Sequence, residues 1–547
     1  MSAPALNRAT LLCVLTFLVA SASAQNPAAL RPIQIENGKL AGVLTPDQKV
    51  IAYKGIPYAQ PPLEDLRWRP PQPIGKWKKV LFARDFGPHC LQSGGYPDMV
   101  FHDSGASEDC LTLNVWAPFV AKPDRKSPLL PVMVWIYGGG FQTGGTSENR
   151  QDGQFLAHRG VIVVSMNYRL GIFGFFTHPE LTAESSNHAS GNYGLMDQAA
   201  AIAWVRRNIA AFGGDPANIT IFGQSAGSSS VSALMASPIA KDLFAKAIGQ
   251  SGAEFPGHGR SLPTREQAEQ ANVAWANRAF GSSKLFLLRM LPANELLDAV
   301  MSKTASAPRF GPVIDGFFLP DTLPHIFADG KQAHIPLLAG WVANESRPDT
   351  PPTADSFTVQ AHIQFGPDAP KFLALYPAST DTEALRSADD FATDQSAFPA
   401  WSWLEAQTRT GNAPVYRYFF DLPSPGDRNH SIAMGAFHSD DIEYVFGALD
   451  SRPGMAIRPE DRALSDLMQQ YWTNFARTGN PNGASSDNPN IAPANSASST
   501  LPQWPAYTPA ANYPVMHLDA HPAAAPDNHR PRYLFLDTLW SKPAPSQ

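Results

Sequence analysis

The stretch 219–235, ITIFGQSAGSSSVSALM, constrains the fold of this chain more than any other. An apolar strand there meets a helix-compatible segment through the motif G-x-S-x-G, which centres on Ser225. The turn is so tight that Cβ atoms at Gly223 and Gly227 would collide with neighbouring backbone, which explains both glycines. An ordinary Gly-rich turn contains the same motif by chance, but its place between strand and helix favours a strained nucleophilic serine.

Apolar runs before this motif indicate a sheet built from alternating strands and helices. Residues 129–137 and 161–168 are rich in β-branched side chains and have the length of buried central strands. Residues 194–216 repeat apolar side chains at helical spacing until Gly213 and Gly214 end the helix. Because a strand, a helix and another strand follow in order, we expect parallel pairing.

The alternation continues less regularly after the serine motif. Apolar stretches at 245–252 and 335–341 predict further strands, and residues 461–478 predict a long helix. Residues 483–505 are poor in large apolar side chains and rich in Ser, Asn, Ala and Pro, so we expect a surface loop there.

A second group of glycines lies after the strand 129–137. Bare glycine backbone at 138–140 can turn two N–H groups toward an oxyanion, and the N–H of Ala226 lies at the start of the helix. We therefore expect Gly139, Gly140 and Ala226 to form an oxyanion hole. Without Ser225 downstream, the same glycines would be equally typical of a flexible loop.

A neutral serine hydroxyl is a poor nucleophile, so it needs a base and an acid that orients the base. In this arrangement they follow in the order serine, acid, histidine. His438 is the best-placed histidine, ahead of an apolar segment in the C-terminal part of the chain. The other histidines after the serine lie before or too near the acid, or in polar or Pro-rich loops: His258, His325, His334, His362, His430, His517, His521 and His529.

The best candidate for the acid is Glu345, because it follows the apolar strand 335–341 and so lies just past a strand end. Asp315 is the nearest rival, but its VIDG context is more typical of a turn. Asp440 and Asp441 follow the histidine and violate the chain order.

The N-terminus predicts export. Arg8 precedes a short apolar run, and Ala22-Ser23-Ala24 suits signal peptidase, so we expect a signal peptide at 1–24 and a secreted or periplasmic protein. The competing interpretation is an uncleaved anchor, but the run is short for a span of roughly 20 apolar residues. No later segment has the character of a transmembrane helix.

Two cysteines, Cys90 and Cys110, remain after Cys13 leaves with the signal. An even pair in an oxidising compartment favours one disulfide, and two unpaired thiols are the alternative. The charge is nearly balanced, with 42 basic and 48 acidic residues, and no Lys/Arg cluster is present. Neither nucleic acid nor an anionic membrane is therefore an expected partner.

The chain resembles the type-B carboxylesterase and cholinesterase-like family over almost all of the mature sequence. The resemblance rests on several separated motifs in the family's order: KGIPYAQPP, SEDCLTLNVWAP, VWIYGGGF, GNYGLMDQ, FGQSAGS, AIGQSG, FGPVIDG, GAFHSDDIEYVFG and YWTNFARTGNPN. It implies an α/β-hydrolase fold, in which helices flank a large mixed, mostly parallel sheet and long loop insertions form a substrate gorge. Residues 25–547 would form a single catalytic domain.

The resemblance also implies the site. Carried over residue by residue, it makes Ser225 the acyl nucleophile, Glu345 the orienting acid and His438 the general base. It implies that Gly139, Gly140 and Ala226 form the oxyanion hole and that Cys90 and Cys110 form a disulfide.

The chain departs from its relatives in ways that concern the substrate. Gln224 replaces the Glu that often precedes the nucleophile, which removes a charge that would favour a cationic ester. The loop between the cysteines has Tyr96 and Phe101 but no Trp for stacking on quaternary ammonium. Both departures disfavour choline esters.

We expect an enzyme that hydrolyses small to medium neutral or hydrophobic carboxylic esters through an acyl-enzyme, without a metal or organic cofactor. The alternatives are a specialised ester, carbamate or amide as substrate, or a binding or adhesion protein that kept the fold and lost catalysis.

Overall fold

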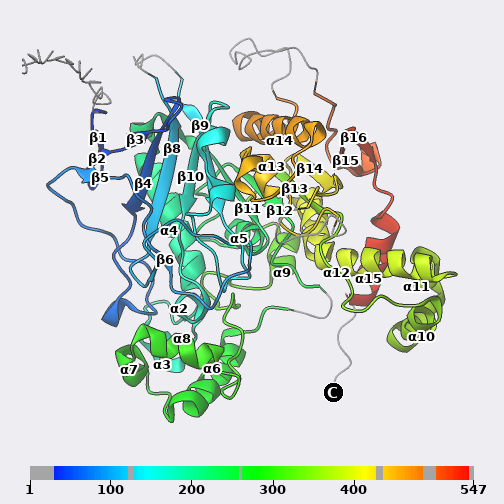
Figure 1. Cartoon of the computed structure of the whole chain (residues 1–547). Helices are drawn as coiled ribbons and strands as arrows, with labels where there is room; N and C mark the ends of the chain where they lie inside the picture. The colour runs from blue at the N-terminus through cyan, green and yellow to red at the C-terminus, as the bar shows by residue number, and fades with distance from the viewer. Residues whose placement is uncertain (1–29, 121–127, 258–260, 427–434, 484–500, 541–547) are drawn as a thin grey trace, which may run out of the picture. The chain divides into compact units, whose positions relative to one another are not determined.

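The computed structural model describes residues 30–120, 128–257, 261–426, 435–483 and 501–540. The predicted signal peptide at 1–24 lies outside these residues, as does most of the loop predicted at 483–505. By their internal contacts, residues Pro32–Gln547 form one compact unit. All the helices and strands of the described residues belong to this unit (Figure 1).

A large mixed sheet of eleven strands runs through the described part of the unit. From one edge to the other the strands are β16 (Ala523–Pro526), β15 (Pro514–Leu518), β14 (Val415–Phe420), β13 (Leu337–Val342), β12 (Lys246–Gln250), β11 (Gly214–Gln224), β9 (Leu130–Ile136), β10 (Ile162–Met166), β8 (Thr112–Pro118), β4 (Val50–Pro57) and β3 (Val43–Leu44). The seven strands from β15 to β10 are parallel, and antiparallel strands complete both edges. This confirms the predicted fold class.

The pairing of the central strands differs in one detail from the expectation. The strands on either side of the helix predicted within 194–216, β10 and β11, are parallel but not neighbours, because β9 lies between them. Each pairs with β9, and Val132 of β9 lies opposite Ile162 on one side and Ile219 on the other. A crossover helix fixes the direction of the two strands but leaves room for a third strand between them.

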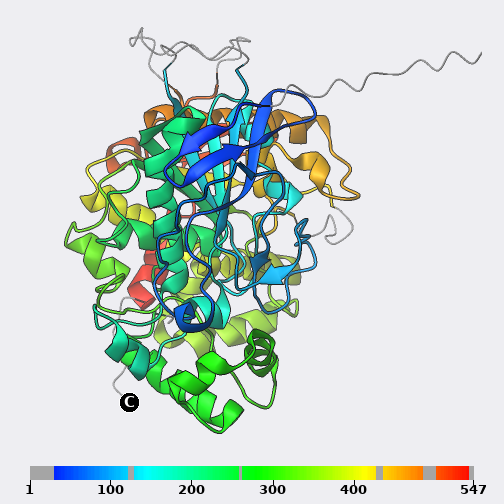
Figure 2. The same cartoon turned by 90° about the vertical axis from the view of Figure 1, so that its left-hand side faces the viewer.

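Short strands lie outside the large sheet. They are β1 (Ile33–Ile35), β2 (Gly38–Ala41) and β5 (Leu81–Phe82) in one small sheet, and β6 (His89–Cys90) and β7 (Ala106–Ser107) in another. In Figure 2 the N-terminal strands, coloured blue, lie nearest the viewer. The bridge of β6 and β7 sits at the disulfide between Cys90 and Cys110, which closes a loop of 20 residues and confirms the predicted pairing.

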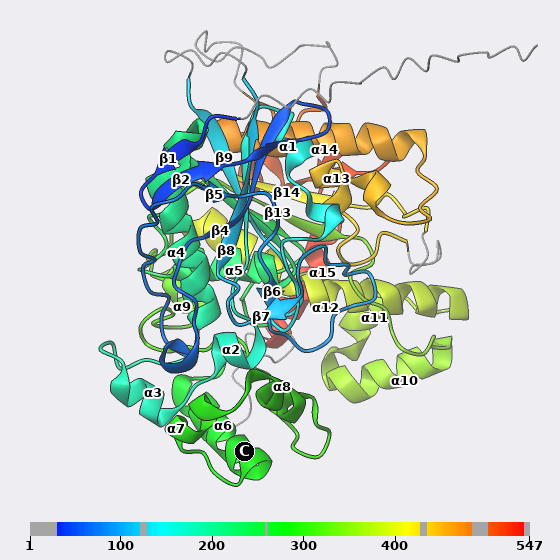
Figure 3. The same cartoon turned by 60° about the vertical axis from the view of Figure 1, so that its left-hand side comes forward.

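Helices pack on both faces of the large sheet (Figure 3). One group comprises α4 (Tyr193–Asn208), α5 (Ala226–Ala236), α9 (Leu323–Ala328), α12 (Asp381–Thr410) and α15 (Arg530–Trp540). The other comprises α1 (Gln154–Ala157), α13 (Ile442–Phe446) and α14 (Pro459–Thr478). The remaining helices cover the ends of strands and belong to insertions: α2 (Gly171–Phe175), α3 (Pro179–Glu184), α6 (Arg265–Phe280), α7 (Leu285–Met290), α8 (Ala293–Met301), α10 (Ala354–Phe365) and α11 (Ala369–Leu375).

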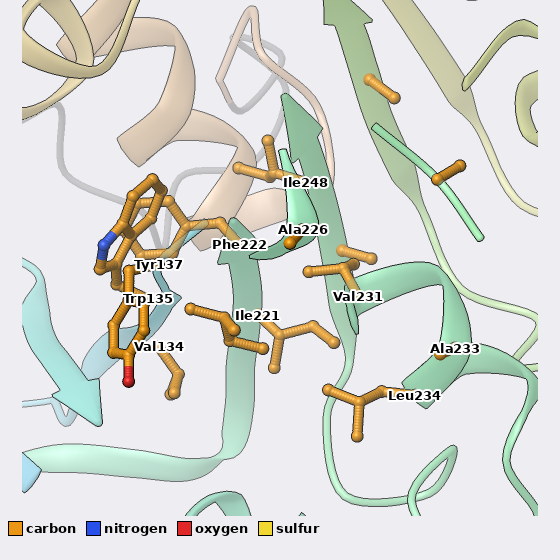
Figure 4. Close-up of a cluster of buried hydrophobic side chains, with 14 of the residues drawn as sticks. Val134, Trp135, Tyr137, Ile221, Phe222, Ala226, Val231, Ala233, Leu234 and Ile248 are labelled. Carbon is orange, nitrogen blue, oxygen red and sulfur yellow. The ribbon is translucent and has the colours of Figure 1, made fainter. Parts of the chain in front are cut away.

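The core lies on both faces of the central strands, as expected for a covered parallel sheet. Figure 4 shows part of it, where Trp135 of β9 and Phe222 of β11 pack with ring centroids 4.8 Å apart. Val231 and Leu234 of α5 are fully buried in the same cluster. Packing on both sides therefore fixes the ends of β9 and β11, where the serine motif and the glycines 138–140 lie.

No helix among the described residues combines the length and the apolar character that crossing a bilayer requires.

Candidate active site

The turn between β11 and α5 holds Ser225 in a strained conformation. Its φ of 56° and ψ of −124° are rare for a residue with a side chain. A Cβ on Gly223 would lie 2.6 Å from the carbonyl oxygen of Gly227, and a Cβ on Gly227 would overlap the carbonyl of Ile136. The steric reason predicted for both glycines is therefore confirmed. The N–H of Ser225 donates to the carbonyl of Gln250 at 2.8 Å, which ties the turn to β12.

Glu345 and His438 lie together although 93 residues separate them along the chain. Glu345 is buried just past β13, where its Oε1 accepts a hydrogen bond from the N–H of Val342 at 3.1 Å. Its Oε2 lies 2.5 Å from Nδ1 of His438.

The backbone holds the two loops in register. The N–H of Asn344 donates to the carbonyl of Ala436 at 2.9 Å, and the N–H of Ala436 donates back to the side chain of Asn344 at 3.1 Å. The acid and the histidine therefore belong to one preorganised pair of loops.

Glu345 governs the charge state of His438. Desolvation lowers the pKa of the imidazole, but the charge of Glu345, its hydrogen bond and the charge of Asp441 outweigh it, so the pKa lies above its usual value. The side chain remains 41% exposed, which leaves the imidazole accessible from the solvent side. With the Nδ1 proton donated to Glu345, the neutral imidazole has a free electron pair on Nε2, as a general base requires.

That electron pair faces the amide of Gln224, whose Nε2 lies 3.2 Å from Nε2 of His438. Among the described residues, no hydrogen bond joins His438 to the hydroxyl of Ser225. Hydrogen bonds between a nucleophile and its base are often long before substrate binds and shorten in the complex. Gln224 thus contacts the nitrogen of His438 that would accept the proton of the serine. Its position beside the serine in the sequence did not predict this contact.

The predicted oxyanion loop has the backbone shape that glycine allows. Gly139 and Gly140 have φ angles of 104° and 64°. The loop folds back on itself, since the N–H groups of Gln142 and Thr143 donate to the carbonyl of Gly139 at 3.0 and 3.1 Å. Within the described chain, the N–H groups of Gly139, Gly140 and Ala226 donate no hydrogen bond to the protein, and Gly140 and Ala226 line the same cavity as Ser225.

A large cavity opens onto the serine. Its volume is about 1470 Å³, and Ser225, Gly140 and Ala226 are among the residues that line it. Another part of its wall comes from the segments 346–365 and 372–399, whose aromatic residues there are Phe357, Phe365, Phe372 and Phe391. Pockets that enclose a drug-sized ligand usually measure roughly 300–1,000 Å³. The volume of the cavity is therefore larger than a short ester requires.

Four charged residues that line the cavity were missed from the sequence: Glu254, Arg309, Arg347 and Asp349. Glu254 lies after β12, and Arg309 donates to the carbonyl of Gly140 at 3.0 Å. The position of Glu254 just past a parallel strand was a usable signal, because ligands bind outside the carboxyl ends of such strands. Arg309 lies in a connecting segment and carried no such signal.

The rejected candidates lie elsewhere. The carboxylate of Asp315 accepts from the N–H groups of Phe317 and Leu319 at 3.0 and 2.9 Å, which confirms a turn acid. His258 and His430 lie outside the described residues. Phe101 stacks on His89 with ring centroids 4.5 Å apart, and Tyr96 is exposed. Neither aromatic residue of the disulfide loop lines the cavity as described.

No group of His, Cys, Asp and Glu in the described ranges has the arrangement of a metal site.

Comparisons with known proteins agree with this geometry. The model of the "Carboxylesterase family" matches residues 30–365 and 369–534. The chain is 36% identical over 488 residues to "Fumonisin B1 esterase" of Sphingopyxis macrogoltabida, covering 85% of each chain. It is 39% identical over 470 residues to "Para-nitrobenzyl esterase" of Bacillus subtilis, covering 82% of this chain and 90% of the relative.

Two further similarities widen the comparison. "Acetylcholinesterase" of Bungarus fasciatus is 32% identical over 544 residues, covering 90% of this chain and 83% of the relative. A solved structure of a PNB esterase superposes with a TM-score of 0.75 at 35% identity, covering 92% of this chain and 99% of that one.

Proposed function

Since this chain belongs to the carboxylesterase family and is a carboxylic ester hydrolase, we propose that Ser225, His438 and Glu345 carry out the reaction. The observation that supports this most is the 2.5 Å contact between His438 Nδ1 and Glu345 Oε2, next to a serine held strained at the turn. This contact leaves Nε2 of His438 ready to accept a proton.

In the first half of the reaction, Ser225 Oγ attacks the ester carbonyl while Nε2 of His438 takes the hydroxyl proton. For this step His438 exchanges its contact with Gln224 for one with the serine. The tetrahedral oxyanion accepts hydrogen bonds from the N–H groups of Gly139, Gly140 and Ala226. The C–O bond to the alcohol then breaks, His438 gives its proton to the departing oxygen, and an acyl-enzyme remains.

In the second half, His438 removes a proton from water, and the resulting oxygen nucleophile attacks the acyl carbon. Collapse of this intermediate returns the proton to Ser225 and releases the acid. Glu345 stabilises the imidazolium in both halves and holds its tautomer. The steps need only groups of this chain and water.

We propose small to medium neutral or hydrophobic esters as substrates. The wall of Phe357, Phe365, Phe372 and Phe391 offers apolar surface to an acyl chain or alcohol, and burial of each methylene group contributes about 0.8 kcal/mol. The absence of a carboxylate at Gln224 supports neutral over cationic groups directly beside the base.

We further propose that residues 1–24 are a signal peptide cleaved after Ala24, so that 25–547 acts as one catalytic domain in the periplasm or the medium. The apolar N-terminal run and the disulfide support this, because disulfides persist in oxidising compartments. N-terminal sequencing of the exported protein should begin at Gln25. Exported protein that still carries residues 1–24 would contradict the proposal.

The test of the site is hydrolysis of p-nitrophenyl acetate, butyrate and octanoate by wild type and by the Ser225→Ala variant. Wild type should turn over all three, and the variant should fall to background. Equal activity of the two proteins would show that Ser225 is not the nucleophile, even though the family assignment would stand.

A further inference from the structure

Glu254 is a carboxylate inside the substrate cavity that the proposed mechanism does not use. It lies past the end of β12, and it lines the same cavity as Ser225 and Ser229. Ester hydrolysis by serine, histidine and acid needs no further carboxylate there. Glu254 is half-buried, and a carboxylate that loses part of its contact with water costs free energy unless it is paired or hydrogen-bonded, so its presence favours a partner.

The segment that carries Glu254 is fixed firmly to α5. Ser228 Oγ donates to the carbonyl of Gly252 at 2.5 Å, and the N–H of Glu254 donates to Ser232 Oγ at 2.8 Å. Between these two contacts, Ser229 and Glu254 line the same cavity, and the Ser229 side chain lowers the pKa of the Glu254 carboxyl. The carboxylate is therefore held in place before any substrate arrives.

Its position relative to the nucleophile follows from the helix. Ser225 and Ser229 are four residues apart, the N–H of Ser229 donates to the carbonyl of Ser225 at 2.9 Å, and both side chains face the cavity. Ser225 directly precedes α5 and Ser229 lies in the first turn of this helix, so Glu254 and the nucleophile face the same cavity near the start of α5.

Within the described residues, no basic side chain forms an ion pair with Glu254. Desolvation raises the pKa of Glu254 to about 7, while the charge of Arg309 and the hydrogen bond from Ser229 lower it. Arg309 is exposed, and it donates to the carbonyl of Gly140. The hydroxyl of Ser229 is neutral. The carboxylate therefore has room for a cationic partner that enters the cavity.

We propose that Glu254 and Ser229 form a subsite for a protonated primary or secondary amine on the acyl or alcohol half of an ester substrate. The inference rests on the proposed function, and it extends the substrate range beyond neutral esters. An ammonium group both donates a hydrogen bond and brings a positive charge into direct contact with the carboxylate. A quaternary ammonium has no N–H to donate, so it gains only the charge attraction and should bind this subsite less strongly than a primary or secondary ammonium.

The test compares esters that differ only in an ammonium or a methyl group at the same position. One pair is p-nitrophenyl 6-aminohexanoate and p-nitrophenyl heptanoate, and the other is 5-aminopentyl butyrate and hexyl butyrate. Assays at about pH 8 keep the amines protonated, and they keep most of Glu254 ionised because its pKa is about 7. Rates of the Ser225→Ala variant give the background.

In at least one pair, wild type should prefer the ammonium ester by roughly 10- to 100-fold in kcat/KM, as a hydrogen bond to a charged group implies. The Glu254→Gln variant should lose this preference and keep its rate on the neutral ester within a few-fold. The matched control is Glu295→Gln, which changes an exposed glutamate of α8 outside the cavity and should keep the preference.

A wild type without preference, or a Glu254→Gln variant that retains it, would overturn the proposal. A preference for mono-p-nitrophenyl adipate, which carries a carboxylate, would also overturn it and would point to an arginine of the cavity, Arg309 or Arg347. If wild type hydrolysed neither the ammonium esters nor the neutral esters, the result would instead contradict the proposed function.

A measurement on wild type alone covers the case in which Glu254→Gln does not fold. Hexylamine should inhibit hydrolysis of p-nitrophenyl butyrate competitively, with an inhibition constant roughly ten-fold below that of 1-heptanol, for the same reason. Equal inhibition by the two compounds would overturn the proposal.

Discussion

Two parts of the cavity are built in different ways. Around Ser225 the backbone decides the shape: Gly223 and Gly227 let neighbouring segments approach, and Gly139 and Gly140 adopt the positive φ angles of their loop. The part of the wall from α10 to α12 depends on side chains. There Phe365 and Phe372 stack with ring centroids 4.3 Å apart, and Phe372 meets Phe391 edge-on at 5.0 Å.

This difference separates the residues that carry out the reaction from the residues that select the substrate. Backbone groups at strand ends cannot be changed by most substitutions without disturbing the sheet, so the chemistry is fixed. Side chains on an inserted helix can change volume while the sheet stays intact. Changes at the serine end should therefore affect all esters alike, and changes at the wall should affect esters by size.

The largest effect is expected for Ser225→Ala. Loss of the nucleophile should lower kcat by up to about 10⁶-fold on short and long esters alike. Steady-state rates on p-nitrophenyl acetate and octanoate measure this, with Ser186→Ala, an exposed serine, as control. If activity were lost on only one of the two esters, the distinction between the serine part of the cavity and its wall would be wrong.

Glu345→Gln should come next. By analogy with triads in which the acid becomes an amide, kcat should fall by about 10⁴-fold, because the imidazolium loses its counter-charge and the tautomer changes. The residual activity should also respond to pH differently. Activity requires neutral His438, so it falls as pH drops through the pKa of the imidazole, which Glu345 raises.

The acid limb of kcat/KM in wild type should therefore lie above the usual histidine pKa of about 6.5. In Glu345→Gln it should move to lower pH. An unchanged acid limb would mean that another group controls the ionisation.

Gln224→Glu should have an intermediate effect at the serine end. A carboxylate in place of the amide, which lies 3.2 Å from Nε2 of His438, would stabilise the imidazolium. Opposite charge at such a distance shifts a pKa by roughly 1–3 units, so the acid limb should move to higher pH and the rate near pH 7 should fall about 10-fold or more. A pH profile that coincides with wild type would indicate that Gln224 does not face the base during turnover.

The smallest effect is expected at the wall, and it should depend on ester size. Gln364→Trp places a large ring on the cavity side of α10. It should lower kcat/KM for the octanoate by roughly 10-fold, which is a typical cost of steric misfit in a hydrophobic pocket. The kcat/KM for the acetate should stay unchanged. Ile363→Trp changes the adjacent exposed residue, which does not line the cavity as described, and serves as control. An equal loss of kcat/KM on both esters would contradict the expectation that this wall selects esters by size.

Local sequence predicted much of the serine end. The steric need for Gly223 and Gly227, the strand before Glu345 and the turn role of Asp315 all appear in the structure as expected. Each depends on residues within a few positions of one another, where bond geometry and short-range sterics decide the outcome. The order of β10, β9 and β11 was not predictable in the same way, since helical spacing says nothing about which strand lies between two others.

The sequence by itself determined where the strained serine stands and which strands and glycines surround it, because a tight turn is settled by its own few residues. Only the tertiary structure decided that Gln224 faces His438, that Glu254 lies beside Ser229, and that helices about 150 residues downstream close the cavity. Such contacts form when distant segments pack on a common sheet, and packing free energy is summed over the whole core.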